Sequence, residues 1–339
     1  MSPLLLIVSC ERTYEILQSE GTPELSVNVP LVSGDTLHYA YIVTSMENQV
    51  KSVGNAHLSC YVNGSLCSES DILLPASSGN EAWDDEKAVK KIPFVAKFTS
   101  GDVICLNVNA DGMSVTSEVC APKPAEILGA DTVAVTAGTH SGNIRQLTGL
   151  NVRICDVSGT NNYYRVMCAL KYSIYEKNLS DGNEILVREG TDEIKIDNTM
   201  EPAIRKGLES SFGDLSSGYT PNAYNLFTDE LFRDKEYTLA LRVPEISSLK
   251  SLGSPYVSGD SRTRLRESRT LVIRLLTMPY DAYVYYMNCS LSSGQNTFNL
   301  LPFVNYPDNV IGGNGFAVAM SSRDYEIKLA DIADLFSGK

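Results

Sequence analysis

Alternation of apolar and polar positions dominates this chain, and it predicts strands rather than helices. Between residues 164 and 171 the even positions are Tyr, Val, Cys and Leu, whereas Arg165 and Lys171 stand among the odd ones. The segment 237–243 repeats the pattern, with Tyr, Leu, Leu and Val at the odd positions. A period of two places successive side chains on opposite faces of a strand. Both segments are therefore expected to be half-buried strands, and 271–276 is a third candidate.

Shorter segments of the same kind, separated by turn residues at regular spacing, fill the first third of the chain. Asn63-Gly64 and Asp111-Gly112 are two-residue signals for tight hairpins. About 100 residues of such units is the size of an immunoglobulin-like sandwich. We therefore expect an Ig-like β-sandwich over residues 25–121, with strands at 25–31, 38–44, 57–62 and 104–108.

A proline-marked segment at 122–131 is expected to be a linker to a second, larger domain over 132–335. This domain is predicted to be an elaborated β-sandwich with one or two short helices, so the whole chain is expected to be all-β. One helix is predicted over 279–292, where Pro279 precedes a 3.6-residue stripe of Tyr280, Val284, Met287 and Leu291. The segments 199–233 and 245–268 are irregular and rich in Ser and Gly.

The N-terminus carries an apolar run that ends in Leu-Ile-Val-Ser-Cys10, the pattern of a bacterial lipoprotein processing site. We expect residues 1–9 to be a signal remnant, Cys10 to be acylated, and 10–24 to be a tether. A signal peptide should begin with a positive region, and residues 1–3 contain no Lys or Arg, so we expect further residues upstream. The alternative is a short buried strand with an ordinary core cysteine.

Composition and charge narrow the classes of function. The 339 residues are 43% hydrophobic and 20% charged, which is typical of a folded chain. The net charge of −13 argues against nucleic-acid binding, which needs a basic surface. No run after residue 10 has the length of a membrane span.

Eight cysteines are common in an exported protein and unusual in a cytosolic one. Cys60 and Cys67 flank the Asn63-Gly64 turn symmetrically, so they are expected to face each other and to form a disulfide. Cys155 with Cys168, and Cys105 with Cys120, are weaker candidate pairs. The alternative in each case is a reduced, apolar strand residue. No zinc-ligand spacing is present.

Three segments, in order, carry a resemblance to one family: Asn151–Arg165 (NVRICDVSGTNNYYR), Phe227–Leu239 (FTDELFRDKEYTL) and Phe303–Phe316 (FVNYPDNVIGGNGF). Behind a lipobox cysteine, they resemble the Bacteroidota lipoproteins of domain-of-unknown-function family 4249. The chain departs from the family pattern at Asp234-Lys235 and after Phe316. The resemblance implies an outer-membrane lipoprotein, often encoded near TonB-dependent transporters. It implies no reaction and no catalytic residues.

Candidate chemistry is sparse. The three histidines are His38, His57 and His140, and none lies in a recognisable nucleophile motif. The acidic groups 84–86 and 181–184 offer oxygen ligands for calcium but lack EF-hand spacing, and are expected to be solvated loops. The tyrosines at 280–286 are expected to pack in the core, with a sugar or peptide platform as the alternative. We predict no catalytic residues, no cofactor and no metal.

The sequence therefore predicts a non-enzymatic, membrane-tethered binding or accessory protein of the cell envelope. Its expected location is the outer membrane, anchored by lipid on the periplasmic or surface face. Its expected partner is a TonB-dependent transporter of a nutrient-uptake system, or another envelope protein. The alternatives are a structural or adhesive cell-surface protein and a hydrolase whose site is built from 199–233 and 245–268.

Overall fold

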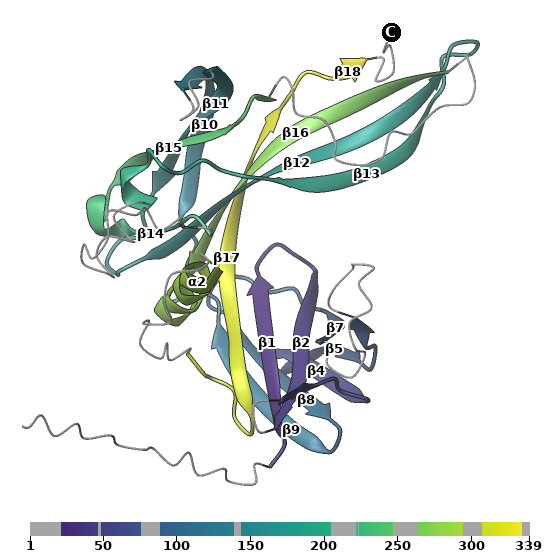
Figure 1. Ribbon diagram of the computed structural model, residues 1–339, viewed down its shortest axis with the longest axis vertical. Coiled ribbons are helices and arrows are strands. Elements are labelled where there is room, and N and C mark those ends of the chain that lie inside the picture. Colours follow the sequence, from purple (N-terminus) through teal and green to yellow (C-terminus); the bar gives the residue numbers. More distant parts are fainter. Residues whose placement is uncertain are drawn as a thin grey trace, which may run out of the picture.

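The computed structural model describes residues 22–46, 49–75, 89–138, 144–204, 222, 224–246, 263–293 and 307–333. Strands make up most of this part of the chain, in three hydrogen-bonded sheets of eleven, three and four strands. The predicted all-β fold class is confirmed. Figure 1 shows two parts, a lower sandwich and an upper part with a projecting arm, connected by one long strand.

The lower part is a β-sandwich built from the N-terminal third of the chain (Figure 1). One sheet contains β1 (Glu24–Val32), β2 (Leu37–Met46), β3 (Gln49–Lys51), β6 (Leu74–Pro75) and β7 (Lys90–Val95). The other has the order β5-β4-β8-β9, with β4 (Ala56–Val62), β5 (Ser65–Ser70), β8 (Val103–Ala110) and β9 (Met113–Cys120). Alternate residues of both sheets meet in one apolar core, as their period-two pattern requires.

The upper part contains a three-stranded sheet, β10 (Glu126–Gly138), β11 (Ile144–Cys155) and β15 (Glu236–Pro244), packed on one end of longer strands. The longer strands are β12 (Tyr163–Asn178), β13 (Glu184–Ile194) and β16 (Thr263–Met278), with the short β14 (Leu226–Thr228) and β18 (Ile332–Ala333) beside them. The far ends of β12, β13 and β16 extend beyond the three-stranded sheet. We call this extension, together with the turn 179–183, the arm (Figure 1).

Strand β17 (Asn314–Lys328) belongs to both parts, which sequence pattern alone did not indicate. Residues 314–320 pair in parallel with β1, and residues 321–328 pair antiparallel with β16. Ala317 and Ala319, together with Val310, lie in the core of the sandwich. The predicted boundary at 132–335 is therefore wrong for the segment 307–320. A short alternating segment shows which face is buried but not which distant strand it will pair with.

The predicted linker at 122–131 is also too long. Strand β10 already begins at Glu126, and the hydroxyl of Ser321 donates a hydrogen bond to the carbonyl of Pro122. The two parts are held further by Arg274 of β16, whose guanidinium pairs with Asp324 at 2.8 Å and with Asp35 at 3.0 Å. Because Asp35 lies in the β1–β2 turn, this ion pair joins the sandwich to the upper part.

The glycines before and within β17 are explained by how closely that strand approaches β1. A Cβ on Gly313 would lie 2.2 Å from the carbonyl oxygen of Leu25, and one on Gly315 would lie 2.0 Å from that of Val27. Gly315 also has a φ of +131°, which side chains rarely adopt. The glycine run is therefore required for strand packing.

The predicted helix is present as α2 (Tyr280–Ser293), but its buried face differs from the predicted stripe. Ala282, Tyr283 and Met287 are buried against β16 and β17, whereas the side chain of Tyr280 is 58% exposed. Four of the seven residues from 280 to 286 are tyrosine, so two different faces of the helix are equally apolar in the sequence. Packing against β16 and β17 decides which of these two faces is buried.

Candidate functional site

The first two family-like segments meet at a buried polar network centred on Asn162. Its side-chain amide donates to the carbonyl of Val157 at 2.6 Å and to the carboxylate of Asp156 at 3.1 Å. Its backbone N–H donates to the carboxylate of Asp229 at 3.1 Å. Asp229 begins the single 3-10 turn Asp229–Leu231, so Asn162 joins the loop after β11 to the loop before β15.

Asp156 receives two further donors in this network. The hydroxyl of Tyr164 donates to one oxygen in a very short hydrogen bond, and the backbone N–H of Asp234 donates to the other at 2.8 Å. Burial raises the pKa of Tyr164, and the neighbouring Asp156 carboxylate raises it further. The donors to Asp156 are all groups of the protein itself, so the network fixes the two loops to each other.

Glu201, in the segment proposed as a hydrolase loop, is also fully enclosed. Its carboxylate accepts from the hydroxyl of Tyr237 at 2.8 Å, from the N–H of Ala203 at 3.0 Å and from the N–H of Ala240 at 2.5 Å. Burial, followed by the bond to Glu201, raises the pKa of Tyr237. Glu201 therefore holds the start of its loop against β15. Most of 199–233 and 245–268 lies outside the described residues.

His38 is a buried residue of the sandwich. It lies between the rings of Phe94 and Phe98, and its Nε2 lies 3.1 Å from the carbonyl oxygen of Ala96. Burial lowers the pKa of His38, which favours the neutral imidazole. It is a core residue of the sandwich. His140 lies outside the described residues.

His57 has the contacts of a nucleophile triad. Its Nδ1 lies 2.5 Å from the carboxylate of Asp71, and its Nε2 lies 3.1 Å from the hydroxyl of Ser59, with Glu69 at 3.8 Å. Among the described residues, the backbone beside Ser59 offers no oxyanion hole. Ser59 lies in the central strand β4, where Leu58–Val62 pairs with β5 on one side and β8 on the other. The ladders engage the backbone amides beside Ser59, so they leave none to act as an oxyanion hole.

The predicted Cys60–Cys67 disulfide is not formed, and both thiols are free. The Asn63-Gly64 hairpin turn is confirmed, with both residues at positive φ. A bulge then shifts the register, so that Cys60 faces Ser68 and Cys67 becomes the extra residue. Cys60 is fully buried, and that burial raises the pKa of its thiol to about 12, whereas Cys67 is exposed.

The weaker cysteine pairs are not aligned either. Cys105 faces Glu118, and Cys120 faces Val103, which places the two cysteines two residues out of register. Cys155 and Cys168 lie in different sheets. Cys10, the predicted lipidation site, lies outside the described residues.

The acidic groups do not form a calcium site where the structure describes them. Asp181 accepts the backbone N–H of Asn183 at 3.0 Å, which closes the turn at the end of the arm. Glu184 pairs with Arg266 at 2.7 Å. In the described ranges no group of three or more His, Cys, Asp or Glu is arranged to hold a metal ion. The group 84–86 lies outside those ranges.

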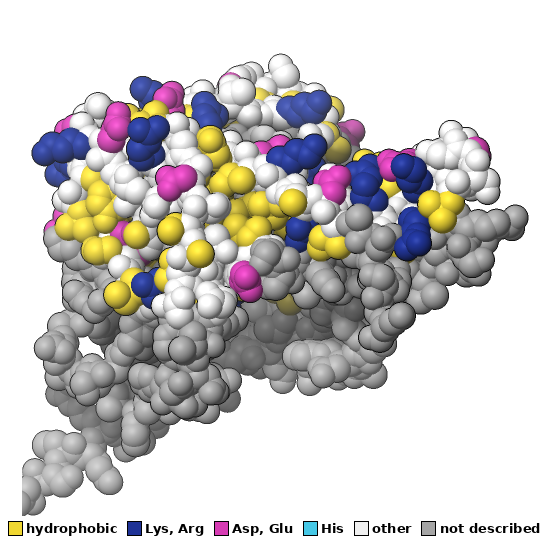
Figure 2. Space-filling model, turned by 90° about the horizontal axis from the view of Figure 1, so that it is seen from above, with side chains coloured by type: hydrophobic (Ala, Val, Ile, Leu, Met, Phe, Trp, Pro, Cys, Tyr) yellow, Lys and Arg dark blue, Asp and Glu magenta, His cyan; other side chains and the backbone are white. Residues whose placement is uncertain are grey.

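The arm is the most exposed apolar region of the upper part. Leu179, Ile185 and Leu186, at and beside its end turn, are 53%, 68% and 47% exposed. Figure 2 shows hydrophobic and basic side chains together on the arm, which projects to the right. Strand β13 is the last strand of the eleven-stranded sheet, so one side of its backbone has no partner strand among the described residues. The alternation of apolar and polar residues predicted strands in this region, but it did not predict that they extend beyond the three-stranded sheet.

Comparison with protein families identifies the chain. Residues 13–326 match the family described as "Domain of unknown function (DUF4249)". The chain belongs to this family. The match covers the sandwich, most of the upper part and the three segments that carried the resemblance.

Other comparisons add little about activity. No curated protein matches the sequence. One similar solved structure is the "Biofilm associated protein - BSP domain", with 8% identity over 90% of this chain and 59% of that one. Its TM-score of 0.17 is too low to carry any argument, and the chain spans less than two thirds of its length. Within the described residues, no helix is long and apolar enough to cross a membrane.

Proposed function

We propose that this protein is a non-enzymatic envelope lipoprotein that binds a partner protein through its arm. The partner is an outer-membrane protein, in the first place a TonB-dependent transporter, and the lipid on Cys10 holds the chain at that membrane. The observation that carries the proposal is the exposed, apolar end of the edge strand β13. The family match assigns no activity and is consistent with this proposal.

Edge strands normally carry features that prevent pairing with other chains. In β13 the inner half has them, since Arg188, Glu189 and Glu193 place charges along it. The outer half has two exposed apolar residues in succession, Ile185 and Leu186. An extended partner segment can add to such an edge through backbone hydrogen bonds while its side chains contact the apolar residues. The outer half of β13 is therefore the part of the arm suited to a partner.

The edge strands of the sandwich are shorter or more polar than the outer half of β13. In the four-stranded sheet the edge strand β5 has six residues and Leu66 is 52% exposed, but Ser65, Ser68, Glu69 and Ser70 make the strand mainly polar. In the first sheet of the sandwich the terminal strand β6 has two residues, and Leu74 within it is 37% exposed. Because β17 is shared, the sheet that carries the arm is continuous with the first sheet of the sandwich. This geometry suits a protein that presents a binding edge away from its anchor.

A site-specific photo-crosslinker at position 185 tests the proposal in cells that make the full chain. The expected product joins the protein to an outer-membrane transporter identified by mass spectrometry. The matched control is position 37, where Leu37 is 51% exposed on the sandwich and should give no such product. The same product from both positions, or products with extracellular proteins alone, would contradict the proposal. The second result would instead favour an adhesive surface protein.

The lipid anchor is tested separately with C10S. Loss of the acylated cysteine should move the protein from the membrane fraction to the soluble fraction, because two or three acyl chains supply the attachment. C67S is the control, since Cys67 is an exposed strand residue that should not affect attachment. Unchanged membrane association of C10S would show that Cys10 is not the anchor.

A further inference from the structure

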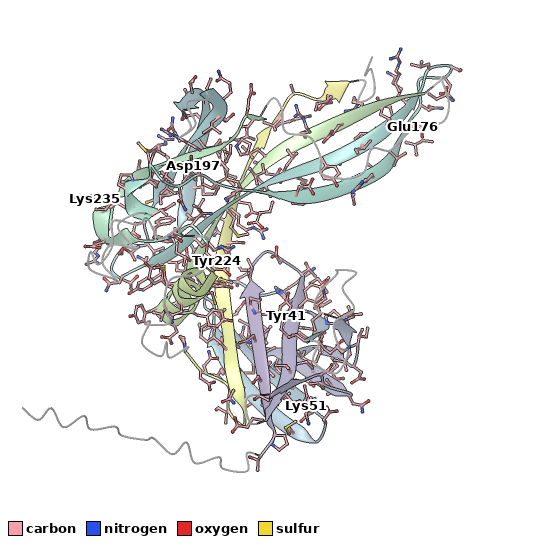
Figure 3. The ribbon with its side chains drawn as sticks, in the orientation of Figure 1. Tyr41, Lys51, Glu176, Asp197, Tyr224 and Lys235 are labelled. Atoms are coloured by element: carbon pink, nitrogen blue, oxygen red, sulfur yellow. The ribbon has the colours of Figure 1, made fainter. Side chains whose placement is uncertain are left out.

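Arg165 lies on the opposite face of β12 from the buried network of Tyr164. Tyr163 and Met167, two residues to either side, pack against α2 and β17, so Arg165 faces the junction between the two parts. Its guanidinium lies 5.0 Å from the ring centre of Tyr224 and 5.5 Å from that of Tyr286. Figure 3 labels Tyr224 beside α2 at this junction.

The charge of Arg165 has no carboxylate partner among the described residues. Arg274, on the adjacent strand and opposite Met167, pairs with both Asp35 and Asp324. No described carboxylate lies within ion-pair distance of Arg165, and its buried Nε has no hydrogen-bond partner there. Burial lowers the pKa of Arg165, partly offset by Tyr286 and Glu193. The guanidinium is therefore partly desolvated, at its Nε, without a carboxylate partner among the described residues.

The tyrosine rings compensate only in part for this desolvation. A cation–π contact is weaker than the hydration that a guanidinium loses on burial. A guanidinium also keeps its proton, so burial does not neutralise it. The balance favours an anion that completes the site.

We propose that Arg165, Tyr224 and Tyr286 form a binding site for a carboxylate carried by a small organic ligand. The planar guanidinium fork matches a carboxylate, and the tyrosine rings would contact the carbon atoms beside it. Burial raises the pKa of Tyr286, so its hydroxyl stays protonated and can donate. The chain is acidic overall, with a net charge of −13, so a singly charged anion fits this site better than phosphate. This site is independent of the proposed role of the arm.

Two sources could supply the carboxylate: an acidic sugar such as glucuronate, and the free C-terminus of a peptide. NMR of the full chain, observing the arginine Nε–H groups, distinguishes these two sources. The protein is titrated separately with glucuronate and with a short peptide. The uncharged controls are glucose for glucuronate and the C-terminal amide for the peptide. One of the two carboxylates should shift the Arg165 signal with a Kd of about 1 mM or below. The uncharged counterpart should not shift it.

Variants assign the binding to this cluster. R165Q should weaken binding at least tenfold, and R165K should weaken it less, because lysine keeps the charge but not the fork. The matched control is R188Q, since Arg188 also lies over a tyrosine ring, at 5.9 Å from Tyr172, but is exposed on β13. Y286F keeps the ring but removes the hydroxyl that would donate to the carboxylate, so it should weaken binding several-fold without a change in fold, and the test holds if R165Q is unstable.

The proposal fails if neither carboxylate shifts the Arg165 signal, or if R165Q and R188Q bind equally. Tighter binding of inorganic phosphate than of either carboxylate would also overturn it. An arm variant, I185S, should bind the carboxylate normally. Failure at this site and failure of the proposed function are therefore distinguishable.

Discussion

Tyr164 and Arg165 are consecutive residues on opposite faces of β12, and their surroundings differ sharply. Tyr164 belongs to a network in which Asp156 and Asn162 have protein partners for their polar atoms. Arg165 has two tyrosine rings and no carboxylate within the described part of the chain. A fully paired buried network is a structural device, whereas an unpaired buried charge points to a ligand.

The largest expected effect comes from removing the acceptor of the paired network. D156A would leave the hydroxyl of Tyr164 and the N–H of Asp234 without their acceptor, and it would remove one of the acceptors of the Asn162 amide. We expect a loss of about 3 kcal/mol in the free energy of unfolding, measured by urea denaturation at neutral pH. D131A is the control, since exposed Asp131 accepts one hydrogen bond, from Asn151, and should change stability by less than about 0.5 kcal/mol. Equal losses would contradict the structural role of the network.

Alkaline pH tests the same network without changing its contacts at neutral pH. Burial raises the pKa of Tyr164 above its unfolded value, and raises that of Tyr283 to about 12. Because its folded-state pKa is raised, each tyrosine makes its full contribution to the free energy of unfolding below about pH 10. That contribution is lost as the pH rises above this value. We expect unfolding free energy to fall between about pH 10 and 12. Y164F should make this fall shallower, and an unchanged slope would show that Tyr164 does not contribute.

Replacement of Arg165 should have the opposite sign from replacement of its paired neighbour. R165M removes a desolvated charge, so without ligand we expect unchanged stability or a gain of about 1 kcal/mol. R274M leaves Asp35 and Asp324 without their cation, so we expect a loss of about 1–3 kcal/mol. Thermal and urea unfolding of both variants measure the contrast. A clear loss in R165M would show that Arg165 stabilises the fold itself.

The smallest effect on stability is expected on the arm. I185S changes a side chain that is 68% exposed, so the free energy of unfolding should change by less than about 0.5 kcal/mol. Crosslinking of the partner from the neighbouring position 186 should nevertheless be lost, because apolar contact at the strand edge is removed. A stable variant that still gives the product would rule out this end of β13 as the contact.

Local pattern predicted those features in which each residue's environment is set by its near neighbours. The alternating segments at 164–171 and 237–243 became β12 and β15, and Asn63-Gly64 formed the predicted turn. The disulfide at Cys60 and Cys67 failed because a single bulged residue changes the register, and bulges leave little local signal. The Arg165 cluster was also not predicted, since its tyrosines come from positions 224 and 286.

The sequence by itself determined the all-β class, the sandwich strands, the α2 helix and the family, because period, turn residues and ordered motifs are local properties. Only the tertiary structure decided that β17 crosses both parts, that the arm projects, and that Arg165 has no carboxylate partner among the described residues. Strand pairing is set by contacts between residues far apart in the chain, such as Val29 with Ala317. A charge becomes unpaired only when folding removes it from water and brings no opposite charge beside it.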